Sequence, residues 1–166
     1  MKHLARIVFG GITLICAALV LTAIFYFQEE LGLEPCPMCI LSRYTFILVG
    51  AVSLVAAIHG PRGWGLKVYA VIVALLSATG LGISLRHSYL QHFPPKMETC
   101  GSDLGFLVGN FPLTQALPKI FAGTGSCSSI DWRFVGLTIP EWTLVWFVIF
   151  IAVAAWAIVA TRRAPK

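Results

Sequence analysis

Residues 7–27 read IVFGGITLICAALVLTAIFYF, a run of 21 residues that contains no charged side chain. A helix needs about 20 mostly apolar residues to cross the hydrocarbon core of a bilayer. The run therefore predicts a membrane-spanning helix. It is longer than the apolar part of a signal peptide, which has about 7–15 residues. We therefore expect the helix to be retained rather than cleaved off.

Three further uncharged runs occupy residues 44–58, 68–85 and 142–161. Of all 166 residues, 58% are hydrophobic and 11% are charged, whereas about 25% of a soluble domain is charged. The composition therefore excludes an ordinary soluble domain. We predict an all-α membrane protein, a four-transmembrane-helix bundle that forms one domain over residues 1–166. The expected helices span roughly 7–27, 39–58, 66–86 and 142–161, and the loops on the outer side roughly 28–38 and 87–141.

The second uncharged run is too short to span a membrane by itself. Its 15 residues would cover about 22 Å as a helix, against a hydrocarbon core of about 30 Å. The helix must therefore begin near Cys39, which puts Arg43 in its first turns at the edge of the apolar layer. An arginine at that depth either extends its charge to the headgroups or has a functional role.

The charges orient the chain in the membrane. Short loops and tails rich in Lys and Arg lie on the cytoplasmic side, so both termini are expected there. The basic residues on that side are Lys2, Arg6, Arg62, Lys67, Arg162, Arg163 and Lys166. All seven acidic residues lie on the other side. The net charge of +5 thus needs no nucleic-acid partner to explain it.

Four of the five cysteines lie on the outer side or at its boundary. Cys36 and Cys39 form a C-x-x-C pair in EPCPMCILSRY (residues 34–44), and Cys100 and Cys127 lie in the long loop. Disulfides persist in oxidising compartments. Three pairings are possible, and we favour Cys36–Cys39 with Cys100–Cys127. Cys16 is expected to be a small residue that is buried or faces lipid.

Several uses of these cysteines are open. A structural zinc site often has two C-x-x-C pairs, but only one is present, so no metal is expected. A structural disulfide in so small a loop would gain little loop entropy. Thiol–disulfide exchange fits better, because a helix N-terminus and a nearby arginine favour the reactive thiolate. Arg43 lies one turn after Cys39 and could stabilise a Cys39 thiolate or an anion formed beside it.

The sequence resembles a known family over nearly its whole length. PCPMC followed by Arg43, the four helices and the second cysteine pair are similar to the DsbB family of bacterial inner-membrane proteins. RHSYLQHFPP (residues 86–95) and GLTIPEW (residues 136–142) also resemble it. In the long loop, PLTQALPKIF (residues 112–121) predicts a short helix on the membrane surface, interrupted by Pro118.

The resemblance implies an enzyme, a quinone-dependent thiol:disulfide oxidoreductase. Its partner would be a periplasmic DsbA-like thioredoxin-fold protein, whose thiolate attacks Cys100. Cys127 is then released and attacks Cys36, and Cys39 becomes the thiolate that faces a membrane quinone, ubiquinone or menaquinone. Arg43 would support the quinone reaction, and His87 would lie near the quinone headgroup. His87 is otherwise an interfacial histidine without chemistry.

Two other functions are compatible with a four-helix membrane protein of this composition. The first is a non-enzymatic scaffold in the membrane that carries two structural disulfides. The second is a quinone-linked redox protein of the vitamin K epoxide reductase type. That class places its cysteines differently and has no clear counterpart of PCPMCILSRY at the start of the second helix.

Overall fold

The computed structural model describes residues 2–33, 36–93, 130 and 132–163. Its elements are α1 (Lys2–Leu21), the π-helix η1 (Thr22–Glu30) that continues it, α2 (Pro37–His59), α3 (Trp64–His92), β1 (Arg133–Phe134), β2 (Leu137–Thr138) and α7 (Ile139–Arg163). Cys100, Cys127 and the short helix expected at residues 112–121 lie outside the described residues.

Within the described residues, four helices are long and apolar enough to cross a membrane, which confirms the predicted fold class. These spans are Ala5–Glu30, Pro37–His59, Trp64–His92 and Ile139–Ala160. Large apolar side chains point away from the bundle, among them Leu14, Ile58 and Leu75, which are 73%, 71% and 65% exposed. Such surfaces are stable in lipid rather than in water. The chain is a multi-pass membrane protein.

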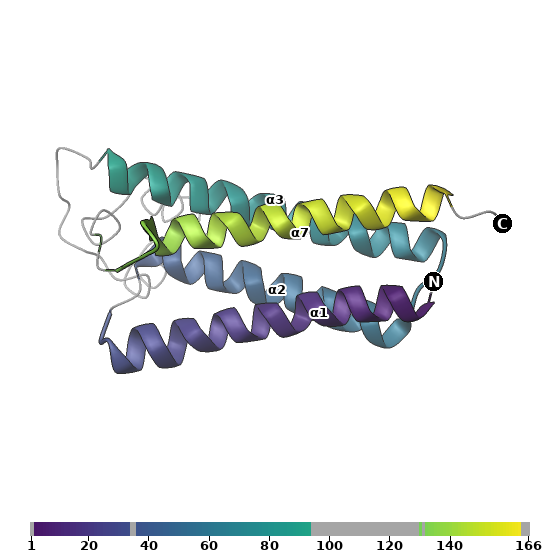
Figure 1. Ribbon diagram of the computed structural model, residues 1–166, viewed down its shortest axis with the longest axis horizontal. Helices are drawn as coiled ribbons and strands as arrows, with labels where there is room; N and C mark the ends of the chain where they lie inside the picture. The colour runs from purple at the N-terminus through teal and green to yellow at the C-terminus, as the bar shows by residue number, and fades with distance from the viewer. Residues whose placement is uncertain (1, 34–35, 94–129, 131, 164–166) are drawn as a thin grey trace, which may run out of the picture.

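The helices form a bundle with both ends of the chain at the same end (Figure 1). The hairpin β1–β2 and the start of α2 lie at the opposite end. Along the bundle, α3 packs most extensively on α7, α1 packs on α2, and α2 also contacts α3. This up-and-down arrangement brings the beginnings of α2 and α7 close to the ends of η1 and α3.

All four spans are longer than the runs read from sequence. The helix α7 begins at Ile139 rather than near residue 142, because GLTIPEW supplies an N-terminal cap. In this cap the carboxylate of Glu141 accepts a hydrogen bond of 2.7 Å from the backbone N–H of Thr138. This is one half of the capping box formed by Thr and a Glu three residues later. The neighbouring helix α3 is also longer at its C-terminal end, where it continues five residues beyond His87.

Small residues allow the helices to approach closely. Gly80 on α3 faces the ring of Phe147 on α7, and a Cβ at Gly80 would overlap that ring. Phe147 in turn stacks on Phe46 of α2, with 4.3 Å between ring centroids. Gly50 contacts Cys16, which is 2% exposed in the core. The prediction that Cys16 is a small residue packed out of water is therefore confirmed.

The hairpin before α7 was not foreseen from the sequence. Arg133 pairs with Thr138, and Phe134 pairs with Leu137. Val135 and Gly136 between them have positive φ angles, 53° and 83°, as two-residue hairpin turns of the primed type require.

The first residues of α7 hold the hairpin in place. The indole N–H of Trp142 donates a hydrogen bond of 3.1 Å to the carbonyl of Phe134. This bond keeps the aromatic side chains of the hairpin at the end of the bundle that carries Cys36 and Cys39.

Candidate functional site: a thiol pair at the wall of an apolar cavity

Cys36 is the N-cap of α2. Its backbone is extended (φ −65°, ψ 159°), Pro37 follows in the first turn, and the sulfur accepts a hydrogen bond from the backbone N–H of Cys39 at 3.4 Å. Ser, Thr, Asp and Asn are the residues usually found at this position. A sulfur at this position lies at the positive end of the helix dipole, which stabilises a thiolate there.

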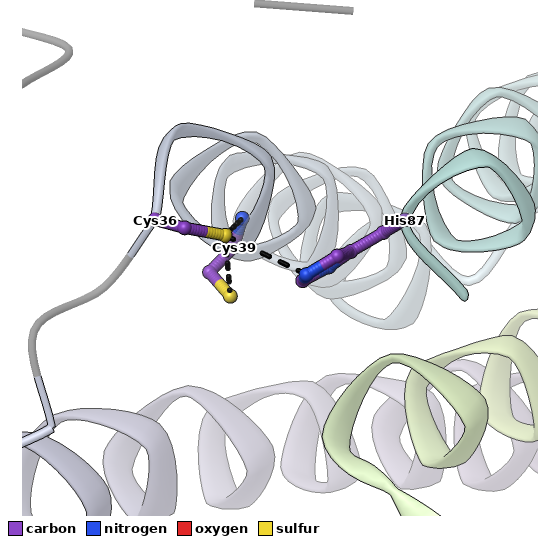
Figure 2. A group of neighbouring side chains, drawn as sticks. All are labelled: Cys36, Cys39 and His87. Atoms are coloured by element: carbon purple, nitrogen blue, oxygen red, sulfur yellow. Dashed lines mark hydrogen bonds between the residues drawn. The ribbon is translucent and has the colours of Figure 1, made fainter. Parts of the chain in front are cut away.

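His87 reaches the same sulfur from another helix. It lies on α3, is 4% exposed, and places Nε2 at 3.6 Å from the sulfur of Cys36. Figure 2 shows the imidazole pointing from α3 toward the start of α2. The structure therefore brings His87 to the thiol pair itself, in a buried position where an imidazole can exchange a proton with Cys36.

The two cysteine sulfurs are in contact but are not bonded to each other. They lie 3.2 Å apart, whereas a disulfide bond is about 2.05 Å long. The separation is short enough that a small rotation of either side chain brings the sulfurs to bonding distance. The Cys36–Cys39 disulfide expected for the resting protein stays a prediction.

Arg43 lies one turn below Cys39, within the first two turns of α2, as the sequence predicted. Within the described residues, its guanidinium donates hydrogen bonds of 2.9 Å to the Gln28 side-chain carbonyl and to the Ala23 backbone carbonyl. Both acceptors belong to η1. The arginine is thus held toward the first helix, and two of its five N–H groups are used there. Gln28 was missed by sequence reasoning because nothing local marks it.

The π-helix η1 supplies these acceptors. It begins at Thr22, whose hydroxyl donates a hydrogen bond of 2.8 Å to the carbonyl of Ala18. Back-bonding of this kind can bend helices, but the same bond occurs within regular α-helices of this bundle, so it does not by itself account for the change. From Thr22 onward the ladder changes to the wider i→i+5 pattern, which is rare and frequently found at functional sites. The altered turn presents Ala23 and Gln28 toward α2.

A cavity of about 330 Å³ opens between these groups, within the range of about 300–1,000 Å³ that is typical of small-molecule sites. Side chains of all four spans and of the hairpin line it, and most of the lining is apolar. The lining residues are Leu19, Val20, Thr22, Ala23, Phe27, Leu33, Cys36, Cys39, Ser42, Arg43, Phe46, His87, Trp132, Phe134, Ile139, Pro140, Trp142, Thr143 and Trp146.

Aromatic rings form one wall of the cavity. Phe27 meets Trp132 edge to face, with 4.8 Å between ring centroids. Trp132 is nearly parallel to Phe134 at 5.8 Å, and Phe134 is tilted against Trp142 at 6.1 Å. Such rings offer flat surfaces on which another planar group can stack. The wall joins η1, the hairpin and α7, so only the folded bundle assembles it.

Of the six site residues predicted from sequence, the structure brings four to one cavity: Cys36, Cys39, Arg43 and His87. The donor atoms of Cys36, Cys39 and His87 all lie within 4.8 Å of one another. Cys100 and Cys127 lie outside the described residues, so their part in the site stays a prediction.

A family model described as "Disulfide bond formation protein DsbB" matches residues 5–157. The chain belongs to the DsbB family. A disulfide bond formation protein B of Aromatoleum aromaticum is 44% identical over 158 residues, 95% of this chain and 94% of the relative. A protein of the same name from Nitrosococcus oceani is 46% identical over 140 residues, 84% of this chain and 83% of that protein.

Family membership supports an oxidoreductase role in disulfide bond formation. It therefore favours thiol–disulfide exchange over a scaffold with structural disulfides. The geometry agrees, because Cys36 combines a helix N-terminus, a neighbouring thiol and an imidazole within hydrogen-bonding range.

Proposed function

We propose that the protein oxidises a periplasmic DsbA-like thioredoxin-fold dithiol and transfers the two electrons to a membrane quinone. The supporting observation is that the Cys36–Cys39 pair forms part of the wall of an apolar cavity among membrane-spanning helices. A water-soluble electron acceptor would not need such a cavity. A lipid-borne planar acceptor would, and the aromatic wall and Arg43 fit a ring that carries polar oxygens.

The proposed exchange is balanced in electrons and protons. The partner's thiolate attacks Cys100 of a Cys100–Cys127 disulfide, and Cys127 leaves as a thiolate. Cys127 then attacks Cys36 of a Cys36–Cys39 disulfide, which breaks that bond and releases Cys39. The partner's second thiolate resolves the mixed disulfide at Cys100, and Cys100 in turn releases Cys127 from Cys36. The net result is an oxidised partner and a reduced Cys36–Cys39 pair.

Re-oxidation of the pair uses the groups around the cavity. A quinone, ubiquinone or menaquinone, supplies the capacity to accept two electrons and two protons. Cys39 lines the cavity and is less buried than Cys36, so we assign its sulfur to the acceptor. The helix N-terminus and His87 hold Cys36, and His87 can carry a proton from it. Arg43 stabilises the negative charge that develops beside Cys39.

The same arrangement supports a proposed orientation in the membrane. Both chain ends lie at the end of the bundle opposite the thiol pair (Figure 1), and the basic residues cluster there in the sequence. By the positive-inside rule, we place both termini in the cytoplasm and the thiol pair at the periplasmic face of the bacterial inner membrane.

The direct test mixes the purified protein, a quinone and a reduced DsbA-like protein. We expect one quinol to form for each partner disulfide. Quinone absorbance measures the first product, and thiol counting measures the second. Without the partner no quinol should form, and without the quinone at most two partner disulfides should form per protein, one for each disulfide of the resting chain. Oxidation of the partner that continues at the same rate without quinone would refute the proposed acceptor.

Arg43→Ala is expected to slow quinone reduction by about 10- to 100-fold, because charge-assisted hydrogen bonds are worth about 1.5–3 kcal/mol. Formation of the mixed disulfide at Cys100 should keep its rate. Arg43→Lys should recover only part of the loss, since an ammonium lacks the planar fork of donors. Stopped-flow quinone absorbance and trapping of the mixed disulfide measure the two steps.

Arg133→Ala is the matched control for this experiment. It removes a positive charge from the same end of the bundle, and Arg133 is exposed and is not part of the cavity lining. We expect it to leave both steps unchanged. If Arg43→Ala slowed both steps equally, Arg43 would act as an anchor between α2 and η1. If it slowed neither, its assignment to the site would be wrong.

A further inference from the structure

Three side chains at the end of the bundle present atoms that bind thiophilic metals. Cys36 is the N-cap of α2, Cys39 lies in the first turn of that helix, and His87 comes from α3 (Figure 2). Their donor atoms all lie within 4.8 Å of one another. Cys36 and His87 are buried and Cys39 is partly buried. Sequence reasoning set a metal aside because it considered the cysteines alone, and it did not include the histidine.

Two of the three separations between these donor atoms can be compared with those in a tetrahedral centre, and the third, from Cys39 Sγ to His87 Nε2, is within 4.8 Å. At bond lengths of about 2.3 Å to sulfur and 2.0–2.1 Å to nitrogen, such a centre separates two sulfurs by about 3.8 Å and a sulfur from a nitrogen by about 3.6 Å. The observed separation of Cys36 Sγ from His87 Nε2 is 3.6 Å. The two sulfurs are 3.2 Å apart, so they need to move apart by only about half an ångström, a direction that repulsion between thiolates favours.

We propose that the reduced Cys36–Cys39 pair and His87 together bind a divalent d¹⁰ cation, Zn²⁺ or Cd²⁺, in a tetrahedral Cys₂His site. The fourth position faces the cavity, since all three residues line it. Two thiolates neutralise the cation, which matters where surrounding side chains exclude water. Binding releases the two thiol protons, because only thiolates are strong ligands. No electron is transferred in this step.

The redox state of the pair controls this site. In the Cys36–Cys39 disulfide the sulfurs carry no charge and are about 2.05 Å apart, so two of the three ligands are lost. In the metal-bound form the sulfurs are held at about 3.8 Å and cannot form the disulfide. The metal therefore captures only the reduced protein. Metal binding itself does not depend on the proposed function. The expectation that bound metal blocks turnover does rest on that function.

The test measures binding without partner or quinone. The full-length protein in detergent carries Cys100→Ser and Cys127→Ser, so that the loop thiols cannot contribute. It is reduced, freed of reductant and titrated with Co²⁺ and with Cd²⁺, and thiolate-to-metal charge-transfer absorption is recorded. We expect one metal per chain, two protons released per metal in weak buffer, and no absorption after oxidation of the pair.

Substitutions then assign the ligands. Introducing Cys36→Ser or Cys39→Ser into this parent protein should abolish the charge-transfer absorption. His87→Leu should weaken binding by more than the 10- to 100-fold that loss of an outer-shell partner costs. Cys16→Ser should bind like its parent, because Cys16 is buried between α1 and α2, away from the cavity lining. Thermal unfolding checks that each variant is folded.

X-ray absorption of the zinc-loaded parent needs no further substitution and should show two sulfur ligands and one imidazole. Absence of charge-transfer absorption in the reduced parent would overturn the proposal. Binding of unchanged affinity in folded His87→Leu would also overturn it, as would a sulfur count other than two. A protein that binds no metal but still reduces quinone would leave the proposed function intact, which keeps the two failures distinguishable.

Discussion

Cys36→Ser is expected to abolish catalytic turnover while leaving the protein at least as stable as the parent. The sulfur of Cys36 caps α2 by accepting the N–H of Cys39, and serine is a preferred residue for that position. A hydroxyl can therefore keep the helix end intact. It cannot form a disulfide with Cys39, so the pair to which the proposed function assigns electron transfer is lost.

The measurements are quinone turnover with a reduced partner and thermal unfolding in the same detergent. The expected result is turnover at background level together with an unfolding temperature equal to or above that of the parent. Cys36→Ala is the informative comparison, because it removes both the chemistry and the cap. It should be less stable than Cys36→Ser by about 0.5–2 kcal/mol, the usual value of an N-cap.

Cys16→Ser provides the control for general loss of a thiol and should retain turnover. Two outcomes would contradict the interpretation. Turnover near the parental rate in Cys36→Ser would remove Cys36 from the electron path. Equal stability of Cys36→Ser and Cys36→Ala would show that the sulfur's contact with the N–H of Cys39 contributes nothing to helix capping.

Gly80→Leu is expected to prevent the bundle from packing. Even a Cβ at Gly80 overlaps the ring of Phe147, and that ring is backed by Phe46 in a stack of 4.3 Å between centroids. Both rings are almost completely buried, so neither has free space to enter. Forcing extra atoms into a packed core costs about 1–3 kcal/mol or more. The milder Gly80→Ala should lower the free energy of unfolding by an amount within this range.

Gly82→Ala is the matched control on the same helix, since nothing lies within 4 Å of a Cβ at that position. It should raise stability slightly, because alanine favours a helix over glycine by about 1 kcal/mol. Yield of monodisperse protein and thermal unfolding measure these effects. If Gly80→Leu folded with parental stability, the contact between α3 and Phe147 would not be a constraint on the bundle.

Gly80→Ala should also reduce the space in the cavity beside Cys39. Phe46 lines the cavity, and it is the partner onto which a displaced Phe147 would be pushed. Packing at the centre of α3 is in this way linked to the space beside Cys39.

The four spans were predictable because a span is a local property of the chain. A bilayer requires about 20 apolar residues in sequence, and this requirement can be read without knowledge of any partner helix. The same requirement moved the start of the second helix back to Cys39 and so put Arg43 in its first turns. The C-x-x-C spacing alone marked Cys36 and Cys39 as a pair. The TIPE motif that caps α7 is equally local, although its cap was recognised only in the structure.

Tertiary structure decided everything that depends on contact between helices. His87 is 51 residues from Cys36 in the chain, and only the packing of α2 on α3 places its imidazole at the capping sulfur. Arg43 binds Ala23 and Gln28 because α1 changes to a π-helix at Thr22, a change that no residue pattern announces. Apolar periodicity reports which residues avoid water, but in a membrane lipid and protein are equally apolar. The sequence therefore determined that these helices cross the membrane, and packing between side chains determined which faces meet and enclose the cavity.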